Sequence, residues 1–272
     1  MPPRKKKHYR GYSQFSEKDN RMKNIIIYGI NWTNCYALES IFKQKYPEKR
    51  VKTCNSLTGL LRSITEMPDA GLILSLNPHE HVYLFHALQA RLQNRRVLVI
   101  ADRLYYIDRC VLQYFGVMDY VLKDELSTII HPEREKVRLP EAWLRFCHRP
   151  HRKAVVATYA FNAGETPEEV LSNINQYAWW NLPPGVTQAK YALLILLSSG
   201  YPAMDLAKKF GLGTKTVSIY RKKVMYRLGM DSSPLALFRG LKLDAHLQRT
   251  AFAHNPDVSN DNCQLPIAVG MN

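Results

Sequence analysis

Short apolar runs alternate with helical patterns through residues 22–130. Runs rich in β-branched and aromatic residues predict five strands, at 25–28, 51–54, 72–76, 97–101 and 117–122. Between them, apolar residues recur at helical spacing and predict helices at 36–46, 57–64, 82–92 and 105–115. Strands separated by helices of this length are typical of a parallel sheet covered on both faces. We therefore predict an α/β domain over residues 22–130.

Residues 181–245 have a different pattern, that of a compact all-helical unit. Thr187 and Gly200 bracket a first helix, and Pro202 separates it from a short second helix. A glycine turn at 211–213 leads to a third helix at 214–228. In the first two helices we expect six residues to face inward: Leu193, Leu194, Leu197, Leu206, Ala207 and Phe210.

The predicted third helix has two different faces. Its inner face carries Val217, Val224 and Leu228, with Met225 beside them. Its opposite face carries Lys215, Ser218, Ile219 and Lys222 at i, i+3, i+4, i+7 spacing. The window 206–230 holds seven basic residues and no acidic one, whereas an ordinary solvated helix mixes both signs. A basic helix held by a shorter helix across a glycine turn suits the major groove of DNA.

Several residues of this unit also form a known motif: Val186-Thr187, Leu196-Leu197, Gly200, Leu206-Ala207, Leu212, Lys215-Thr216-Val217, Arg221 and Leu228-Gly229. Through this motif the chain resembles the LuxR-type (GerE-type) helix-turn-helix DNA-binding domain. The resemblance implies an all-α domain of four helices whose third helix enters the major groove. It also implies that the fourth helix, here 234–241, is a dimerisation surface formed by Leu235, Phe238 and Leu241.

Helix geometry and the matching family positions together assign DNA contacts. We expect three side chains at base edges: Ser218, Ile219 and Lys222. Ile219 would touch a thymine methyl group, and Lys222 would reach the O6/N7 edge of a guanine. Phosphate contacts that fix the register are expected from Lys215, Thr216, Arg221, Lys223 and Arg227. For Thr216, a role at the helix terminus is an equal alternative.

The α/β unit resembles a flavodoxin-like response-regulator receiver domain. The resemblance lies in the order of strands and helices, the proline after the third strand and the run Gly116…Asp119-Tyr120-Val121-Leu122-Lys123. A working receiver needs an acidic pair after its first strand to hold Mg²⁺ and a phosphate-accepting aspartate after its third. Here these positions read Gly29-Ile30-Asn31 and Asn77-Pro78, and Asp102 replaces the usual Ser or Thr after the fourth strand.

We therefore predict a degenerate receiver, a protein–protein module that acts without phosphorylation. Lys123 would have lost its partners and would be a surface lysine. The whole arrangement resembles the atypical Rcs-type subgroup of regulators. Some members of that subgroup form heterodimers with a conventional response regulator.

Charge supports a polyanionic partner, because 38 Lys and Arg face 23 Asp and Glu, a net charge of +15. Charge alone leaves DNA, RNA and anionic membrane open. The sequence lacks an apolar run long enough for a membrane helix and an apolar signal core, which favours a cytoplasmic, nucleoid-associated protein. Its five scattered cysteines suit reduced thiols.

The remaining segments are predicted to be connections and tails. Residues 1–21 form a basic solvated tail or a non-specific phosphate clamp, and residues 246–272 a polar, poorly ordered tail. Residues 131–180 form a linker with helical segments, in which Trp143, Tyr177, Trp179 and Trp180 pack between domains rather than stack on a ligand.

Catalysis and metal binding find little support in the sequence. His79, Glu80, His81 and His86 cluster, and so do Cys147, His148 and His151, but neither group has the pattern of a metal site. Motifs for nucleotide binding or nucleophilic catalysis are lacking. We predict no enzyme activity, no cofactor and no metal.

These features together predict a sequence-specific transcription regulator, an activator, whose partners are double-stranded DNA and RNA polymerase. It would act as a homodimer or as a heterodimer with another response-regulator-type protein. One alternative is an accessory regulator that binds DNA only together with such a partner. Another is an RNA-binding protein that uses charge alone and so shows no preference for duplex DNA.

Overall fold

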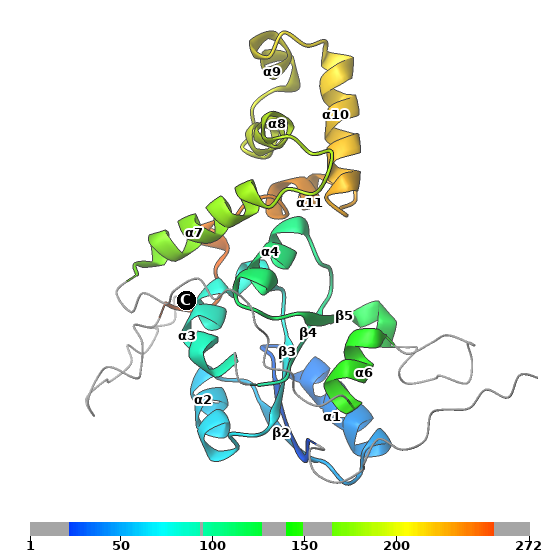
Figure 1. The fold of residues 1–272 in the computed structure, drawn as a ribbon, viewed down its shortest axis with the longest axis vertical. Helices are drawn as coiled ribbons and strands as arrows, with labels where there is room; N and C mark the ends of the chain where they lie inside the picture. Colours follow the sequence, from blue (N-terminus) through cyan, green and yellow to red (C-terminus); the bar gives the residue numbers. More distant parts are fainter. Residues whose placement is uncertain (1–21, 93–94, 127–139, 149–164, 253–272) are drawn as a thin grey trace, which may run out of the picture.

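A five-stranded parallel sheet forms the centre of the N-terminal half (Figure 1). The computed structural model describes residues 22–92, 95–126, 140–148 and 165–252. The strands are β1 (Asn24–Tyr28), β2 (Arg50–Cys54), β3 (Gly71–Ser75), β4 (Val97–Ala101) and β5 (Asp119–Leu122). Their order across the sheet is β2-β1-β3-β4-β5, and every pair is parallel. This is the flavodoxin-like order, so the predicted fold class is confirmed.

Helices cover both faces of this sheet, as expected for parallel strands. One face is covered by α1 (Trp32–Lys45) and α6 (Glu141–His148). The other is covered by α2 (Leu57–Glu66), α3 (Val82–Leu92) and α4 (Tyr106–Tyr114). Side chains of β1 alternate between the two cores: Ile25 and Ile27 belong to the first, Ile26 and Tyr28 to the second.

The position of α6 corrects the predicted linker at 131–180. Trp143 is fully buried and stacks on Phe42 of α1, with 4.7 Å between ring centroids. Phe146 and Cys147 are buried beside it, so Trp143, Phe146 and Cys147 form one apolar stripe at helical spacing. This segment is part of the sheet domain rather than a connection. The linker residues 131–139 and 149–164 lie outside the described residues.

The C-terminal half is helical, as predicted. It consists of α7 (Pro167–Trp180), α8 (Gln188–Ser198), α9 (Ala203–Lys209), α10 (Thr214–Arg227) and α11 (Pro234–Arg239). The side chain of Thr187 caps α8 and that of Ser233 caps α11, each by accepting a backbone N–H three residues on. Short 3-10 helices complete the fold at η1 (Pro78–Glu80), η2 (Lys123–Glu125) and η3 (Ala245–Leu247).

Four of the six predicted inner residues of this unit are buried: Leu193, Leu194, Leu206 and Ala207. Leu197 is half-buried and packs against the same core. Phe210 is exposed, so its predicted position is wrong. It follows the last residue of α9 as the C-cap, where the chain already turns away from the helix.

The sheet domain and the helical unit share one apolar core. The cluster around β1 and β3 continues through α4 and α7 into Tyr191 of α8, Met225 of α10 and Leu237 of α11. The Tyr106 hydroxyl donates a 2.6 Å hydrogen bond to the carbonyl of Ala178, at the end of α7. The backbone N–H of Ile107 donates to the carbonyl of Gly240 at 3.0 Å. The two halves are therefore joined by packing as well as by the chain.

Aromatic residues near this junction only partly follow the prediction. Trp179 packs against Tyr191, and Tyr177 packs against Tyr114, each pair with ring centroids 5.8 Å apart. These two contacts join α7 to its neighbours as expected. Trp180 is instead exposed, and Trp143 lies within the sheet domain. Every helix in the described part of the chain is too short or too polar to cross a bilayer.

Candidate nucleic-acid interface

A glycine turn and a small apolar core hold α9 and α10 together. The turn between them contains Gly211, whose φ of 63° is left-handed and open to glycine at little cost. The N–H of Leu212 donates to the carbonyl of Ala207 at 2.8 Å and closes the end of α9. Leu206, Ala207 and Val217 then share a small core with Leu193 of α8. The helix pair is thus held as a rigid helix-turn-helix unit.

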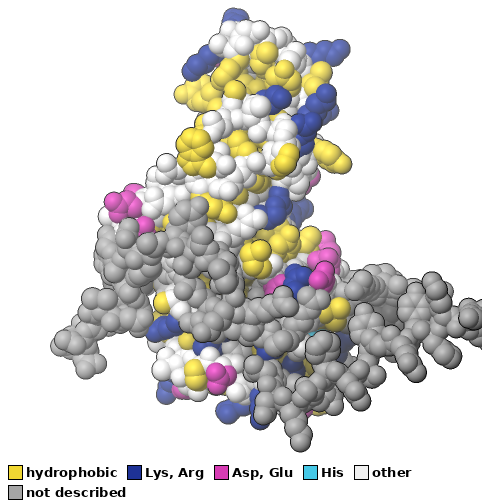
Figure 2. Space-filling view, viewed as in Figure 1, with side chains coloured by type: hydrophobic (Ala, Val, Ile, Leu, Met, Phe, Trp, Pro, Cys, Tyr) yellow, Lys and Arg dark blue, Asp and Glu magenta, His cyan; other side chains and the backbone are white. Residues whose placement is uncertain are grey.

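The predicted inner and outer faces of α10 are both where the sequence places them. Val217, Val224, Met225 and Leu228 are buried. Ser218, Ile219 and Lys222 face solvent, with Ile219 41% exposed, and so do Lys215 and Lys223. Figure 2 shows Lys and Arg side chains gathered along the edge of the molecule that α10 forms in Figure 1. The exposed face therefore combines one aliphatic side chain with a rim of cations.

Two of the expected phosphate contacts have partners inside the protein. The Arg221 guanidinium donates to the carbonyl of Ser232 at 3.0 Å, and Arg227 donates to the carbonyl of Gly185. These bonds fasten α10 to the loops before α8 and α11. Thr216 is half-buried in the first turn of α10. Contact of all three residues with phosphate stays a prediction.

The surface predicted for dimerisation needs one correction. Leu235 and Phe238 are exposed on α11, but Leu241 is 0% exposed. The helix ends at Arg239, so Leu241 lies beyond it, where the chain enters the shared core. Its carbonyl there accepts a hydrogen bond from the Tyr191 hydroxyl. Leu241 is therefore part of the core that the two halves share, and it cannot face a partner in this arrangement.

The carboxyl end of the sheet, where a receiver would hold Mg²⁺ and phosphate, carries an ion pair. Lys123 Nζ lies 2.6 Å from Asp102 Oδ1, so the prediction that Lys123 has lost its partners is wrong. Asn31 caps α1 by accepting from the N–H of Thr33 at 3.0 Å. A side chain at Gly29 would meet Cys35 Sγ at 2.9 Å. The Cys35 thiol therefore occupies the space beside Gly29, at the end of β1.

The sequence did not reveal a buried carboxylate that joins the two halves. Glu80 is 3% exposed, and its Oε1 lies 3.1 Å from Arg239 Nη1 at the end of α11. Its Oε2 lies 3.2 Å from Arg249 Nε, and its carbonyl accepts the Arg249 N–H at 2.8 Å. We call these three residues the Glu80 clamp. Arg239 and Arg249 follow Glu80 by 159 and 169 residues, so no periodic pattern in the sequence could have linked them.

The neighbouring histidines are used in packing and hydrogen bonding. His79 Nδ1 lies 2.8 Å from Asp108 Oδ1, and His81 Nδ1 lies 2.9 Å from Thr250 Oγ1. His86 stacks on Phe252, with 5.3 Å between ring centroids. Burial, then the charge of Arg249, lowers the pKa of His81 to about 4. Within the described residues, no group of three or more His, Cys, Asp or Glu side chains is placed to hold a metal.

These contacts also correct the predicted tail at 246–272. Residues 246–252 lie against the sheet domain through Arg249, Thr250 and Phe252. The amide of Gln248 accepts the Val82 N–H at 3.0 Å and donates to the carbonyl of His79 at 2.8 Å. Residues 253–272 of the predicted tail, and the basic tail at 1–21, lie outside the described residues.

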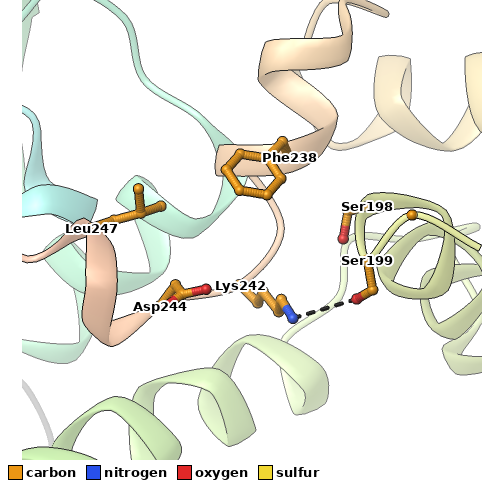
Figure 3. A pocket seen from close by; sticks show the side chains of 7 residues that line it. Ser198, Ser199, Phe238, Lys242, Asp244 and Leu247 are labelled. Atoms are coloured by element: carbon orange, nitrogen blue, oxygen red, sulfur yellow. Dashed lines mark hydrogen bonds between the residues drawn. The ribbon is translucent and has the colours of Figure 1, made fainter.

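An open cavity of about 480 Å³ lies where α8, α11 and η3 meet (Figure 3). Its lining residues are Ser198, Ser199, Gly200, Phe238, Lys242, Asp244 and Leu247. The Lys242 ammonium donates to Ser199 Oγ at 3.4 Å, and the Asp244 carboxylate caps η3 by accepting the N–H of His246. The polar groups of Lys242 and Asp244 are thus used in hydrogen bonds within the protein.

Comparison with known proteins finds likeness in fold. No protein-family model matches the chain, and no curated protein matches it. RcsB, in the structure of two RcsB dimers bound to two parallel DNAs, is 20% identical with a TM-score of 0.51. That match covers 82% of this chain and 98% of RcsB. Full-length FixJ from B. japonicum is 13% identical with a TM-score of 0.33, covering 81% of this chain and 96% of FixJ.

The RcsB match extends over both halves of the chain, so it includes the sheet and the helices that follow it. A 2-1-3-4-5 parallel sheet is followed by helices in which a short helix, a glycine turn and a longer helix stand in sequence. The chain therefore has the fold of RcsB over both halves, a flavodoxin-like α/β domain followed by a helical unit that contains a helix-turn-helix.

Proposed function

We propose that this protein is a transcription regulator that binds double-stranded DNA and reads its sequence with α10. One observation carries the proposal: the exposed face of a helix buried on its other side presents Ser218, Ile219 and Lys222 within an acid-free basic window. The match to RcsB supports it, because that RcsB structure is a DNA complex.

The chemistry of this face divides into base reading and anchoring. Ile219 is apolar and exposed, which suits contact with a thymine methyl group, and Lys222 suits the O6/N7 edge of guanine. The neighbouring Lys215 and Lys223 are exposed cations without a base-specific geometry, which suits phosphates. Base contacts discriminate between sequences, whereas phosphate contacts strengthen binding to all of them.

Alanine substitutions at neighbouring lysines test this division. A selection from random duplexes first identifies the preferred sequence, and fluorescence anisotropy then measures affinity for it and for an unrelated duplex. We expect Lys222→Ala to weaken the preferred duplex by about 1–3 kcal/mol and to relax the preference. We expect Lys223→Ala to weaken both duplexes alike and to reduce the salt slope by about one.

Lys23→Ala is the matched control, because it removes one exposed cation from the sheet domain. Wild-type affinity in both α10 variants would refute the assigned roles. Equal binding of single-stranded RNA and duplex DNA would favour the charge-only alternative.

We also propose that the regulator acts without phosphorylation. The positions after β1 and β3 hold Asn31 and Asn77, and the nearby Asp102 is paired with Lys123. A cage for Mg²⁺ would need more than this one carboxylate. Incubation with a small phosphodonor and Mg²⁺ should leave the intact mass and the DNA affinity unchanged. A mass increase of one phosphoryl group, lost in Asp102→Asn, would contradict the proposal.

Assembly through α11 is the remaining part of the proposal. Leu235 and Phe238 are exposed apolar side chains on this helix, which supports a dimer with a second copy or with another response-regulator-type protein. Sedimentation of wild type and Phe238→Ala, with and without DNA, tests the homodimer. A gel shift with co-purified partner tests the heterodimer. Activation through RNA polymerase stays a prediction, for which a promoter reporter should rise with the protein.

A further inference from the structure

The exposed face of α10 carries an aromatic side chain that the assigned contacts leave out. Tyr226 is 82% exposed, more than any other large hydrophobic side chain in the described residues. It follows Ile219 by seven residues, nearly two helical turns, and therefore lies in line with it on the same face. Lys222 and Lys223, four and three residues earlier, flank it on this face.

Packing within the chain does not explain this tyrosine. Its two preceding neighbours, Val224 and Met225, are buried, and Tyr226 points the opposite way. Within the described residues its hydroxyl has no hydrogen-bond partner. A ring so exposed contributes little apolar burial to the fold. Tyr226 is therefore free to contact a binding partner through its ring and its hydroxyl, next to the cations Lys222 and Lys223.

Position along α10 identifies what Tyr226 would meet. Seven residues advance about 10.5 Å along a helix, and the major groove is about 12 Å wide. Recognition helices contact bases mainly with their N-terminal residues. With Ile219 at the bases, the last turn of α10 therefore reaches the wall of the groove, where phosphate and deoxyribose lie. Tyrosine is among the side chains that hydrogen-bond to phosphate oxygens.

We propose that Tyr226 is a DNA-backbone contact whose hydroxyl donates to a phosphate oxygen and whose ring packs on the adjoining deoxyribose. The proposal rests on DNA binding by α10 and adds a contact of a different kind. A phenol is neutral, so it releases no counterion when it binds. Its contribution should therefore be independent of salt, unlike that of Lys223. This difference separates a hydrogen bond from a charge contact at the same wall.

Anisotropy titrations of the full chain on the preferred and the unrelated duplex, at several salt concentrations, test the proposal. We expect Tyr226→Phe to weaken both duplexes about tenfold, the effect of losing a hydrogen bond to a charged group. Tyr226→Ala should weaken them further, because the ring contact is lost too. In both variants the slope of log affinity against log salt should equal that of wild type.

Tyr36→Phe is the control, since Tyr36 is an exposed tyrosine on the sheet domain. Wild-type affinity in Tyr226→Phe and Tyr226→Ala would overturn the proposal while DNA binding by α10 stands. A loss confined to the preferred duplex would overturn it as well, since a base contact would then be responsible. If wild-type protein binds neither duplex, the proposed function fails first, and this inference fails with it.

Discussion

Substitutions in the Glu80 clamp test how the two halves of the chain are held together. Glu80→Gln keeps the size and an acceptor oxygen of the side chain but removes its negative charge. Arg239 and Arg249 then lose the carboxylate at 3.1 and 3.2 Å. Removing one partner of a fully buried ion pair costs about 3–5 kcal/mol. Here the arginine side chains are 34% and 58% exposed and recover part of their hydration.

We therefore expect Glu80→Gln to lower the free energy of unfolding by about 1–3 kcal/mol, below the cost for a dry pair. The two arginines should differ. Arg239→Gln should cost more than Arg249→Gln, because Arg239 is the more buried of the two. Arg249 is more exposed, so water can replace its partner more easily. Arg249→Gln should therefore lower the free energy of unfolding by no more than about 1 kcal/mol.

Urea unfolding followed by circular dichroism gives these energies, and a double-mutant cycle isolates the pair. The single variants Glu80→Gln and Arg239→Gln, with the double variant, should show a coupling energy above about 0.5 kcal/mol. Glu66→Gln is the control, since Glu66 is an exposed carboxylate paired with Lys52 and Arg62. An additive cycle, or a Glu80→Gln variant as stable as wild type, would refute the clamp.

Three further changes have results that follow from the packing. Because the pKa of His81 is near 4 in the fold and about 6.5 unfolded, the unfolded chain binds more protons between these values. Stability should fall by about 1 kcal/mol per pH unit as pH drops from 6.5 toward 4, and His81→Gln should flatten that slope in urea titrations. Trp143→Ala should cost about 3–5 kcal/mol by leaving a cavity against Phe42, whereas exposed Trp180→Ala should leave the urea midpoint unchanged. Ser233→Ala removes the cap on α11 and should cost about 1 kcal/mol, a loss that Ser233→Asp restores.

Local patterns predicted the elements well where neighbours in sequence are neighbours in space. The strands begin and end within two residues of their expected positions, because buried parallel strands leave compact runs of β-branched residues. The two faces of α10 followed from helical spacing alone. Both are properties of one element and depend little on what packs against it.

Features that depend on distant partners were missed. Trp143 and Phe146 lie on a helix only eight residues long, and the prolines around it favoured a linker. Leu241 is buried in a core that also contains Tyr191, fifty residues away, and the carboxylate of Asp102 reaches Lys123 across two strand ends. The Glu80 clamp joins residues about 160 positions apart. Such contacts depend on how distant elements pack, and distant packing leaves no repeating pattern in a single sequence.

The shared core at the junction of α4, α7 and α11 changes what a substitution far from the exposed face of α10 can do. Tyr106 belongs to the sheet domain, yet its hydroxyl bonds to the end of α7, and Ile107 bonds to the residue after α11. Because Met225 of α10 lies in this shared core, the stability of α10 depends on the packing of the sheet domain as well. A destabilising substitution in α4 would leave the exposed face of α10 unchanged and still lower the fraction of correctly folded molecules. If α10 binds DNA as proposed, the apparent affinity would drop by that fraction.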